Sequence, residues 1–520
     1  MNYFNLITEK WIPSNKGNVS IEDCFVNETI TFIGENARET ISLFKFLSAI
    51  GTAATMFKTN EEQKNCSFKS FKENVKDYLY RNYNDFYMYG EKPFLQFTKL
   101  KEYNKDEFVC TKCLKNLIPT LLNNNPIILY DHQNYSNSDE LKAKLLVLEL
   151  GFCGNSKDAF SSALKIVKFS TNENYVKYAK HDENGSLERG VNSCLGLFAG
   201  NKGTNNGMMH GFIFKKSICE SIFINLINEE FLNDELSFNT IKSIGIPPWK
   251  YGNFTEDCEY KNTYFGTLIP MNRFMLFDKD SEELYYTEGI RNTDGIINGA
   301  LQQDSIFNYT YEVKDSDAGK TLYNTSVKPE YITQPFEALG VALVNNNHDS
   351  YALKKFNKVC DLLEDTDNAY IWVGGVEYDD KDSKASGLRY YVNYIESYLP
   401  FEKSNLFSNN FGVFIKNINS FNSYANEIEK AVYKYYKGLK LKNIFNNKFN
   451  NNFKTDIYTF LNSKYNEIFN NIENNLSQEK IENDITKFFK AEYSKFCNQV
   501  NSKEHFEIFY KFYPKIIFKF

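Results

Sequence analysis

Hydrophobic residues follow two different patterns along the chain, and the change comes near residue 401. Before it, short runs of β-branched and aromatic residues, such as residues 212–214 and 370–373, alternate with isolated helical stretches and turns rich in Gly, Asn and Asp. Short runs of this kind are typical of strands. We therefore predict an α+β fold in which residues 1–400 form a large, irregular mixed domain.

Beyond residue 401, apolar side chains recur three and four positions apart in long segments rich in Lys, Glu and Asn. This spacing places them on one face of a helix. The predicted helices cover residues 417–437, 453–472, 478–500 and 503–520. Because short polar breaks join them, residues 401–520 are predicted to form a C-terminal four-helix bundle.

Two details of this bundle can also be predicted. The third helix carries one apolar stripe that should face the core, formed by Ile481, Ile485, Phe488, Phe489 and Tyr493. The asparagine-rich run at residues 446–452 interrupts the helical pattern, and it predicts a loop between the first two helices.

The length and charge narrow the choice of function. A chain of 520 residues is too long for one ordinary core and predicts about two to four domains. Its formal net charge of -6 argues against a protein that coats nucleic acid through bulk charge, because phosphate binding depends on clustered Lys and Arg. Local contacts with a few base pairs remain compatible with this charge.

The sequence predicts a cytoplasmic protein without membrane contacts. No stretch reaches the roughly 18 apolar residues of a membrane span, and the N-terminus lacks a basic segment followed by an apolar one. Ten cysteines are spread over the chain and do not form a disulfide framework, so most are expected to be buried thiols.

Candidate catalytic groups are few. None of the five histidines lies four positions from another, which is the spacing that puts two metal ligands on one helix face. The sequence also has no nucleophile elbow and no phosphate-binding loop with Gly-Lys-Ser/Thr. We therefore predict that the protein is not an enzyme and needs no cofactor.

Cys110 and Cys113 form the one closely spaced cysteine pair. A two-residue gap lets both thiolates reach one tetrahedral zinc ion. A second such pair is missing, so a complete site needs a distant ligand such as Cys153 or His132. Ordinary thiols are the expectation, and a metal site at this pair is the alternative.

Three landmarks occur in order near the start of the chain. They are residues 4–13 (FNLITEKWIP), a predicted helix at residues 37–56 and residues 93–96 (PFLQ). This order resembles CasA, the large subunit of the type I-E CRISPR surveillance complex, Cascade. Two later landmarks are similar to packing segments of the same family: residues 246–249, with a Pro-x-Trp pattern, and residues 264–268, which the resemblance implies to be a strand.

The resemblance also implies a contact with the 5′ end of the CRISPR RNA. Residues 125–132, followed by a helical run at residues 141–150, look like the family's loop at this position. Leu129, Tyr130 and Asp131 are the implied loop residues. An aromatic side chain there can stack on a splayed base.

A glycine-rich segment precedes a predicted strand at residues 211–214 and a predicted helix at residues 220–226. Glycine lacks Cβ, so such a loop lets the backbone approach a nucleic-acid groove closely. In CasA a loop of this kind enters the minor groove at the protospacer-adjacent motif (PAM). The residues implied to bind DNA are Gly200, Asn201, Lys202, Gly203 and Gly207.

Two further DNA contacts follow from the resemblance. Residues 285–291 lie where the family carries a hairpin with a basic finger, which implies a PAM contact by Arg291. Residues 372–389 look like a hairpin whose tip is a wedge, with Lys384 and Ala385 at the tip. Many family members have glutamine at the first tip position. A lysine can block reannealing and contact a phosphate, but it cannot make the paired donor and acceptor bonds of an amide.

Taken together, the resemblance implies a large Cascade subunit that recognises the PAM in double-stranded DNA, helps to unwind the target for R-loop formation and recruits a helicase-nuclease. Its implied partners are the other Cascade subunits, the CRISPR RNA and the target DNA. Two alternatives stay open: a large subunit of another type I CRISPR system, and a metal-dependent enzyme built around Cys110 and Cys113.

Overall fold

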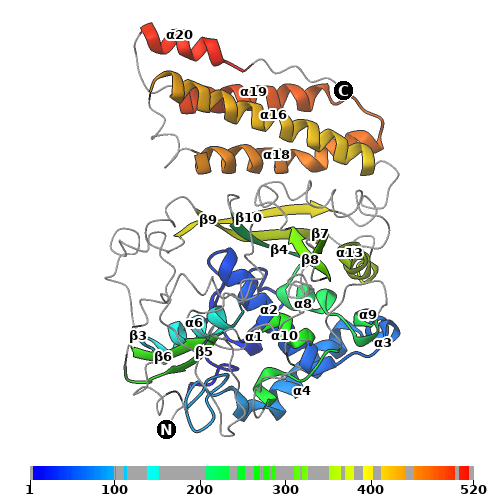
Figure 1. The fold of residues 1–520 in the computed structure, drawn as a ribbon. Coiled ribbons are helices and arrows are strands. Elements are labelled where there is room, and N and C mark those ends of the chain that lie inside the picture. Colours follow the sequence, from blue (N-terminus) through cyan, green and yellow to red (C-terminus); the bar gives the residue numbers. More distant parts are fainter. Residues whose placement is uncertain are drawn as a thin grey trace. The chain divides into compact units, whose positions relative to one another are not determined.

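The computed structural model divides the chain into two compact units, which are described separately (Figure 1). The first unit contains Met1–Pro329, His348–Leu363 and Val373–Glu396, and the second contains Glu330–Asn347, Glu364–Trp372 and Ser397–Phe520. The structure describes residues 4–98, 100, 110–113, 137–151, 206–233, 243–251, 260, 263–269, 271, 273–281, 283–288, 310–316, 319–325, 351–364, 369–379, 390–401, 411–440, 450–497 and 503–514. Within these residues, no helix is both long and apolar enough to cross a membrane.

The fold mixes helices and strands, as predicted, and helices predominate. The helices of the first unit are α1 (Ile21–Val26), α2 (Ala37–Thr55), α3 (Asn60–Asn65), α4 (Phe68–Arg81), α6 (Asp139–Gly151), α8 (Ile218–Asn225), α9 (Glu229–Leu232), α10 (Tyr264–Leu268) and α13 (Tyr351–Asp361), with the 3-10 helices η1 (Tyr83–Phe86) and η5 (Pro248–Lys250). The strands are β1 (Ile12–Ser14), β2 (Gly17–Val19), β3 (Cys110–Cys113), β4 (Asn206–Phe214), β5 (Arg273–Phe277), β6 (Glu283–Glu288), β7 (Thr310–Ser316), β8 (Gly319–Thr325), β9 (Ala369–Asp379) and β10 (Tyr390–Phe401).

Four small sheets are described. Two are two-stranded pairs, β1-β2 and β7-β8, and two have three strands in the orders β10-β9-β4 and β3-β6-β5. In the last sheet, β6 is antiparallel to both neighbours, with Tyr286 opposite Cys110 on one side and Met275 on the other.

Helix α2 forms the centre of the first unit. The Asn36 side chain caps it by accepting a 3.1 Å hydrogen bond from the N–H of Glu39, and the left-handed conformation of Met56 ends it. All residues from Ala37 to Ala53 are buried, including the charged and hydroxyl side chains. The predicted helix at residues 37–56 is therefore confirmed, and it is enclosed on all sides rather than on one face.

Helix α10 corrects one expectation. The resemblance implied a strand at residues 264–268, but Tyr264–Leu268 is a short buried helix. The Thr263 hydroxyl accepts a 3.1 Å hydrogen bond from the N–H of Gly266, which is the bond of a helix N-cap. This cap favours the helix in a segment whose five residues fit either element.

The second unit contains the predicted C-terminal helices: α16 (Phe411–Gly438), α18 (Asn450–Glu473), α19 (Glu479–Cys497) and α20 (Lys503–Phe512). Helix α16 begins earlier than predicted. Helix α18 begins at Asn450, so the predicted loop at residues 446–452 is wrong for its last three residues. Helix α20 ends at Phe512 rather than at residue 520, because Pro514 disfavours the helical conformation of the residue before it.

The bundle core matches the predicted stripe of α19. Ile481, Ile485, Phe489 and Tyr493 are fully buried, while Phe488 is half-buried and stacks on Phe460 with ring centroids 3.9 Å apart.

Three tyrosine hydroxyls form hydrogen bonds between bundle helices. The hydroxyl of Tyr435, on α16, lies 2.6 Å from Nδ1 of His505, a residue of α20. Tyr436 donates to the carbonyl of Phe496 at 2.6 Å, and Tyr493 donates to the carbonyl of Phe509 at 3.0 Å. Each hydroxyl thus has a defined partner inside an apolar core.

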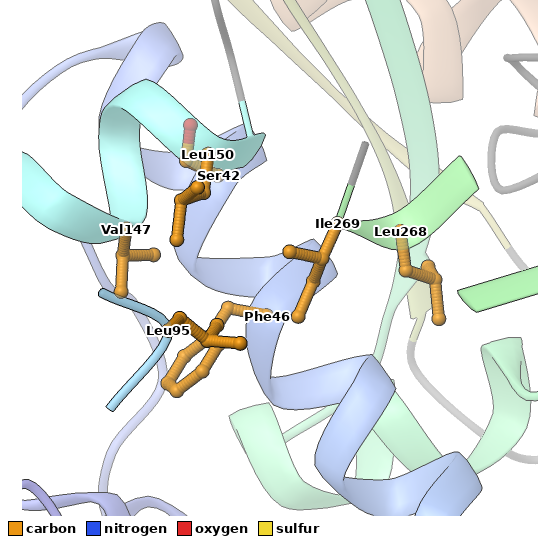
Figure 2. Close-up of a pocket in the computed structure, with 7 residues that line it drawn as sticks. All are labelled: Ser42, Phe46, Leu95, Val147, Leu150, Leu268 and Ile269. Carbon is orange, nitrogen blue, oxygen red and sulfur yellow. The ribbon is translucent and has the colours of Figure 1, made fainter. Parts of the chain in front are cut away.

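A small apolar cavity lies beside α2, between α6, α10 and the segment that follows η1 (Figure 2). It is lined by Ser42, Phe46, Leu95, Val147, Leu150, Leu268 and Ile269. The Ser42 hydroxyl is buried there, and among the residues that the structure describes it has no hydrogen-bond partner. A buried hydroxyl in this state reduces stability, because it loses its bonds to water without replacing them.

We therefore predict that Ser42→Ala raises the free energy of unfolding by about 1 kcal/mol, since it removes an unpaired polar atom and favours the helix. Urea denaturation measures this change. Thr40→Val is the control, because the Thr40 hydroxyl donates to the carbonyl of Ile33 at 2.9 Å and its loss should lower stability. A Ser42→Ala protein no more stable than the parent would contradict the prediction.

Candidate nucleic-acid interface

Most residues predicted to contact nucleic acid lie outside the described part of the chain. These are Leu129, Tyr130, Asp131, Gly200, Asn201, Lys202, Gly203, Arg291, Lys384 and Ala385. Gly207 is described, and it belongs to strand β4, which starts at Asn206. The glycine loop, predicted to run from Gly200 to Gly207, therefore ends before Asn206, where the strand begins. The structure does describe the elements that precede or follow each predicted segment.

Strand β4, which follows the glycine segment, is fixed by a side-chain amide. Asn225 accepts a 3.4 Å hydrogen bond from the N–H of Ile213 and donates one of 2.6 Å to the carbonyl of the same residue. It also donates to the carbonyl of Ser221 at 2.7 Å. The N–H and C=O of one strand residue point to the same side, so Asn225 occupies the edge of β4 that faces away from β9.

The side chains of β4 pack onto the central helix. The ring of Phe44, on α2, lies between those of Phe212 and Phe214, with centroids 4.5 Å and 4.9 Å away. All three rings are buried. The strand that continues from the glycine segment is thus held on one face by aromatic packing and along one edge by an amide.

The same sheet carries the strands on either side of the predicted wedge. Its order is β10-β9-β4, and residues 380–389, which include Lys384 and Ala385, connect β9 to β10. The segment before β4 and the β9–β10 connection were predicted separately as DNA-binding sites. They are connected to neighbouring strands of one three-stranded sheet.

Strand β6, which precedes Arg291, is the middle strand of the other three-stranded sheet. Gln96 of the PFLQ segment supports this sheet, since its side chain accepts a 2.9 Å hydrogen bond from the N–H of Phe277 and donates one of 2.7 Å to the carbonyl of Met88. Lys142 donates to the carbonyls of Asp278 and Lys279 at 2.7 Å and 2.9 Å. The buried side chains of Gln96 and Lys142 therefore hold the end of β5 and the start of its connection to β6.

Helix α6 follows the segment predicted to contact CRISPR RNA, and ionic contacts join it to α2. Arg38 and Glu149 form a buried pair at 2.6 Å, and Lys144 lies 3.1 Å from Glu35 and 3.2 Å from Glu39. Removing one member of a buried pair leaves an uncompensated charge, so these contacts strongly favour one position of α6 on α2.

The two landmarks expected to be packing segments, residues 246–249 and 264–268, do meet, with the rings of Trp249 and Phe265 6.4 Å apart. The PFLQ segment packs beside them. Phe94 of the PFLQ segment stacks on Phe86 with centroids 4.7 Å apart, and Trp249 of the Pro-x-Trp segment lies 5.8 Å from Phe94. The Trp249 indole donates a 2.8 Å hydrogen bond to the hydroxyl of Tyr78, and burial raises the pKa of Tyr78 to about 12. These landmarks therefore build the scaffold.

The proposed metal ligands do not adopt the geometry of a zinc knuckle. Cys110–Cys113 forms strand β3, whereas a Cys-x-x-Cys half-site requires a tight turn between its cysteines. Among the described residues, no group of three His, Cys, Asp or Glu side chains could hold a metal ion.

A family model places this arrangement among known proteins. The model for the CRISPR-associated protein Cse1 matches residues 5–495. The chain belongs to the Cse1 family. Cse1, also called CasA, is the large subunit of type I-E Cascade, so the family assignment made from the sequence landmarks is confirmed. The family acts as a structural surveillance subunit and is not known as an enzyme.

Solved Cse1 structures share the fold across nearly the whole chain. CasA from Thermus thermophilus is 13% identical with a TM-score of 0.59, covering 98% of both chains. Cse1 from Thermobifida fusca is 12% identical with a TM-score of 0.62, covering 98% of this chain and 97% of that one. Cse1 from Acidimicrobium ferrooxidans is 12% identical with a TM-score of 0.59, covering 98% of both. A comparison with curated proteins gave no match.

The sequence interpretation missed the two amides that hold the sheets of this Cse1 protein. Gln96 belongs to a landmark, but it was assigned no role, and Asn225 lies in a predicted helix. The available signal for Asn225 was a lone amide at the end of the apolar run Ile222 to Ile224. Such an amide must find partners when it is buried.

We predict that Asn225→Leu lowers the free energy of unfolding by about 3 kcal/mol, because it leaves the buried N–H and C=O of Ile213 unpaired. Hydrogen exchange at β4 should also become faster than in the parent protein. Asn474→Leu is the matched control, since this exposed amide donates to the carbonyl of Asn470 at 2.8 Å, four residues earlier in the chain. Unchanged exchange at β4 in Asn225→Leu would show that the amide does not support the strand.

Proposed function

We propose that this Cse1 protein recognises the PAM in double-stranded DNA, helps to open the duplex for R-loop formation and recruits the helicase-nuclease. The observation that carries the proposal is the β10-β9-β4 sheet. Its strands adjoin both the glycine segment and the connection containing Lys384 and Ala385, so a single anchored sheet can support PAM inspection and strand separation. Protein-read PAM and RNA-read sequence divide the work in related RNA-guided systems.

In this proposal the segment around Gly200 to Gly203 approaches the minor groove with its backbone, helped by Asn201 and Lys202. Arg291, three residues after the end of β6, contributes a positive charge near the PAM. The support given to β4 by Asn225 and Phe44 favours a fixed starting point for the glycine segment. A rigid base of this kind limits the conformational entropy lost on binding.

Opening of the duplex is assigned to Lys384 and Ala385 as a wedge at the first unwound base pair. The C-terminal bundle holds the displaced strand and presents a surface to the helicase-nuclease. Leu129, Tyr130 and Asp131 contact the 5′ end of the CRISPR RNA, and the ionic contacts of α6 with α2 support the segment that contains them. The other Cascade subunits and the RNA supply most of the affinity, which agrees with a net charge of -6 on this chain.

We predict that Gly203→Val weakens PAM-dependent target binding by the assembled complex about tenfold or more, since a branched side chain obstructs close approach of the backbone. Gly203→Ala should have a smaller effect, which gives a graded series. Gel-shift titration on targets with and without a PAM measures the loss, while co-purification with the CRISPR RNA checks assembly. Normal PAM discrimination by an assembled Gly203→Val complex would refute the groove contact.

We predict that Lys384→Ala slows R-loop opening on a closed duplex about tenfold and leaves a pre-opened bubble almost unaffected. The bubble has already met the unstacking cost of about 1.4 kcal/mol per base-pair step, and a tenfold rate change corresponds to a similar free energy. Stopped-flow fluorescence of a labelled duplex measures the rate.

The control for this experiment is Lys69→Ala, which removes an exposed lysine from α4. A simple phosphate contact at Lys384 would weaken both substrates equally. Equal defects on the two substrates, or no defect, would each exclude the wedge.

A further inference from the structure

Helix α13 carries a lysine in an unfavourable environment. The Lys358 ammonium is buried, and within the described chain it has no hydrogen-bond partner. It lies 4.9 Å from the ring centroid of Phe231, on α9. An ammonium without bonded partners is costly to remove from water, and one aromatic face compensates only part of that cost.

Among the described residues, the charged groups around Lys358 do not neutralise it. Lys355, one turn earlier on the same helix, is buried and repels it, while Glu230 of α9 attracts it. However, the Glu230 carboxylate accepts a 2.8 Å hydrogen bond from the N–H of Asn60 and makes none with Lys358. At the end of α13, Asp361 pairs with Lys64 at 3.6 Å, where both side chains are exposed. Burial first and Lys355 second lower the pKa of Lys358 from 10.5 to about 6.

We call α13 docked when it packs on the first unit as in this structure, and released when it does not. Opposing effects act on the docked position. Val359, Cys360 and Leu363 are buried and favour the docked position through their apolar surface. Lys358 opposes docking, because its amine must lose a proton to be buried at neutral pH. We propose that α13 is a displaceable helix, and that the protonation of Lys358 sets the balance between its docked and released positions. This inference does not depend on how the protein binds DNA.

The pH dependence follows from the direction of the shift. Lys358 in the released helix has the ordinary pKa of 10.5, and in the docked helix about 6, so the released state binds more protons between these values. Docking then becomes about tenfold more favourable for each unit that the pH rises within this window, and is constant below it. The neutral pH range lies inside the window, so modest changes shift the balance.

Two substitutions separate the protonation states. Lys358→Met keeps the length and apolar stem but carries no charge, so α13 should stay docked at every pH. Lys358→Arg is always charged, so α13 should stay released at every pH. Lys64→Met removes an exposed lysine at the same end of the helix, and it should retain the pH dependence of the parent.

Hydrogen exchange of the full-length protein at pH 6.5, 7.5 and 8.5, corrected for intrinsic exchange rates, measures the opening of α13, with the amides of α2 as internal reference. In the parent, opening should fall about 100-fold from pH 6.5 to 8.5 relative to α2. The Lys358→Met protein should show low and constant opening, and the Lys358→Arg protein high and constant opening. A parent without pH dependence, or a Lys358→Met protein with the parent's dependence, would overturn the proposal.

Discussion

The enclosure of α2 is the constraint on which the first unit depends. A helix buried from Ala37 to Ala53 offers no solvent-facing side, so each polar group on it must find a partner among the surrounding elements. Arg38 meets Glu149, Glu39 meets Lys144, and Thr40 meets the carbonyl of Ile33. These contacts determine the position of α6 and of the segment before α2, in addition to the apolar packing. The Ser42 hydroxyl has no hydrogen-bond partner among the described residues, and it lies at an apolar cavity beside the helix.

The two three-stranded sheets are joined to this core by side-chain amides rather than by further strands. Short sheets have exposed edges that must be covered or paired. Asn225 covers β4 by accepting from the N–H and donating to the carbonyl of Ile213. Gln96 accepts from the N–H of Phe277 at the end of β5 and donates to the carbonyl of Met88, outside the sheet. An amide has the hydrogen-bonding groups of a peptide, so it can close an edge where no strand fits. This solution allows α8 and the PFLQ segment to reach the sheets without becoming part of them.

Periodicity predicted the long C-terminal helices well, because α16, α18 and α19 bury apolar residues three and four positions apart. It missed the end of α20, where Pro514 disfavours helix beyond Phe512. The resemblance was wrong at residues 264–268, where a helix capped by Thr263 replaces the implied strand. The family and the order of its landmarks were also predictable from the sequence. The roles of Gln96 and Asn225 were not, since they depend on partners distant in the sequence or on a strand edge that only the fold creates. The DNA and RNA contacts assigned to individual residues stay predictions.

The tyrosine hydroxyls of the bundle have a consequence for how its helices can move. Apolar stripes repeat with every turn, so two helices joined by hydrophobic contacts alone can slide past each other by about 5.4 Å and regain similar packing. The contact from Tyr435 to the His505 side chain has no such repeat. Tyr436 and Tyr493 donate to the carbonyls of Phe496 and Phe509, which lie in the last turns of α19 and α20, where carbonyls lack an intrahelical partner; carbonyls one turn earlier are already bonded within the helix. Sliding of α16, α19 or α20 by one turn would break them inside an apolar core. The three helices therefore keep one axial register. If this group moves, its helices move together, and the side chains on its outer surface keep their positions relative to one another.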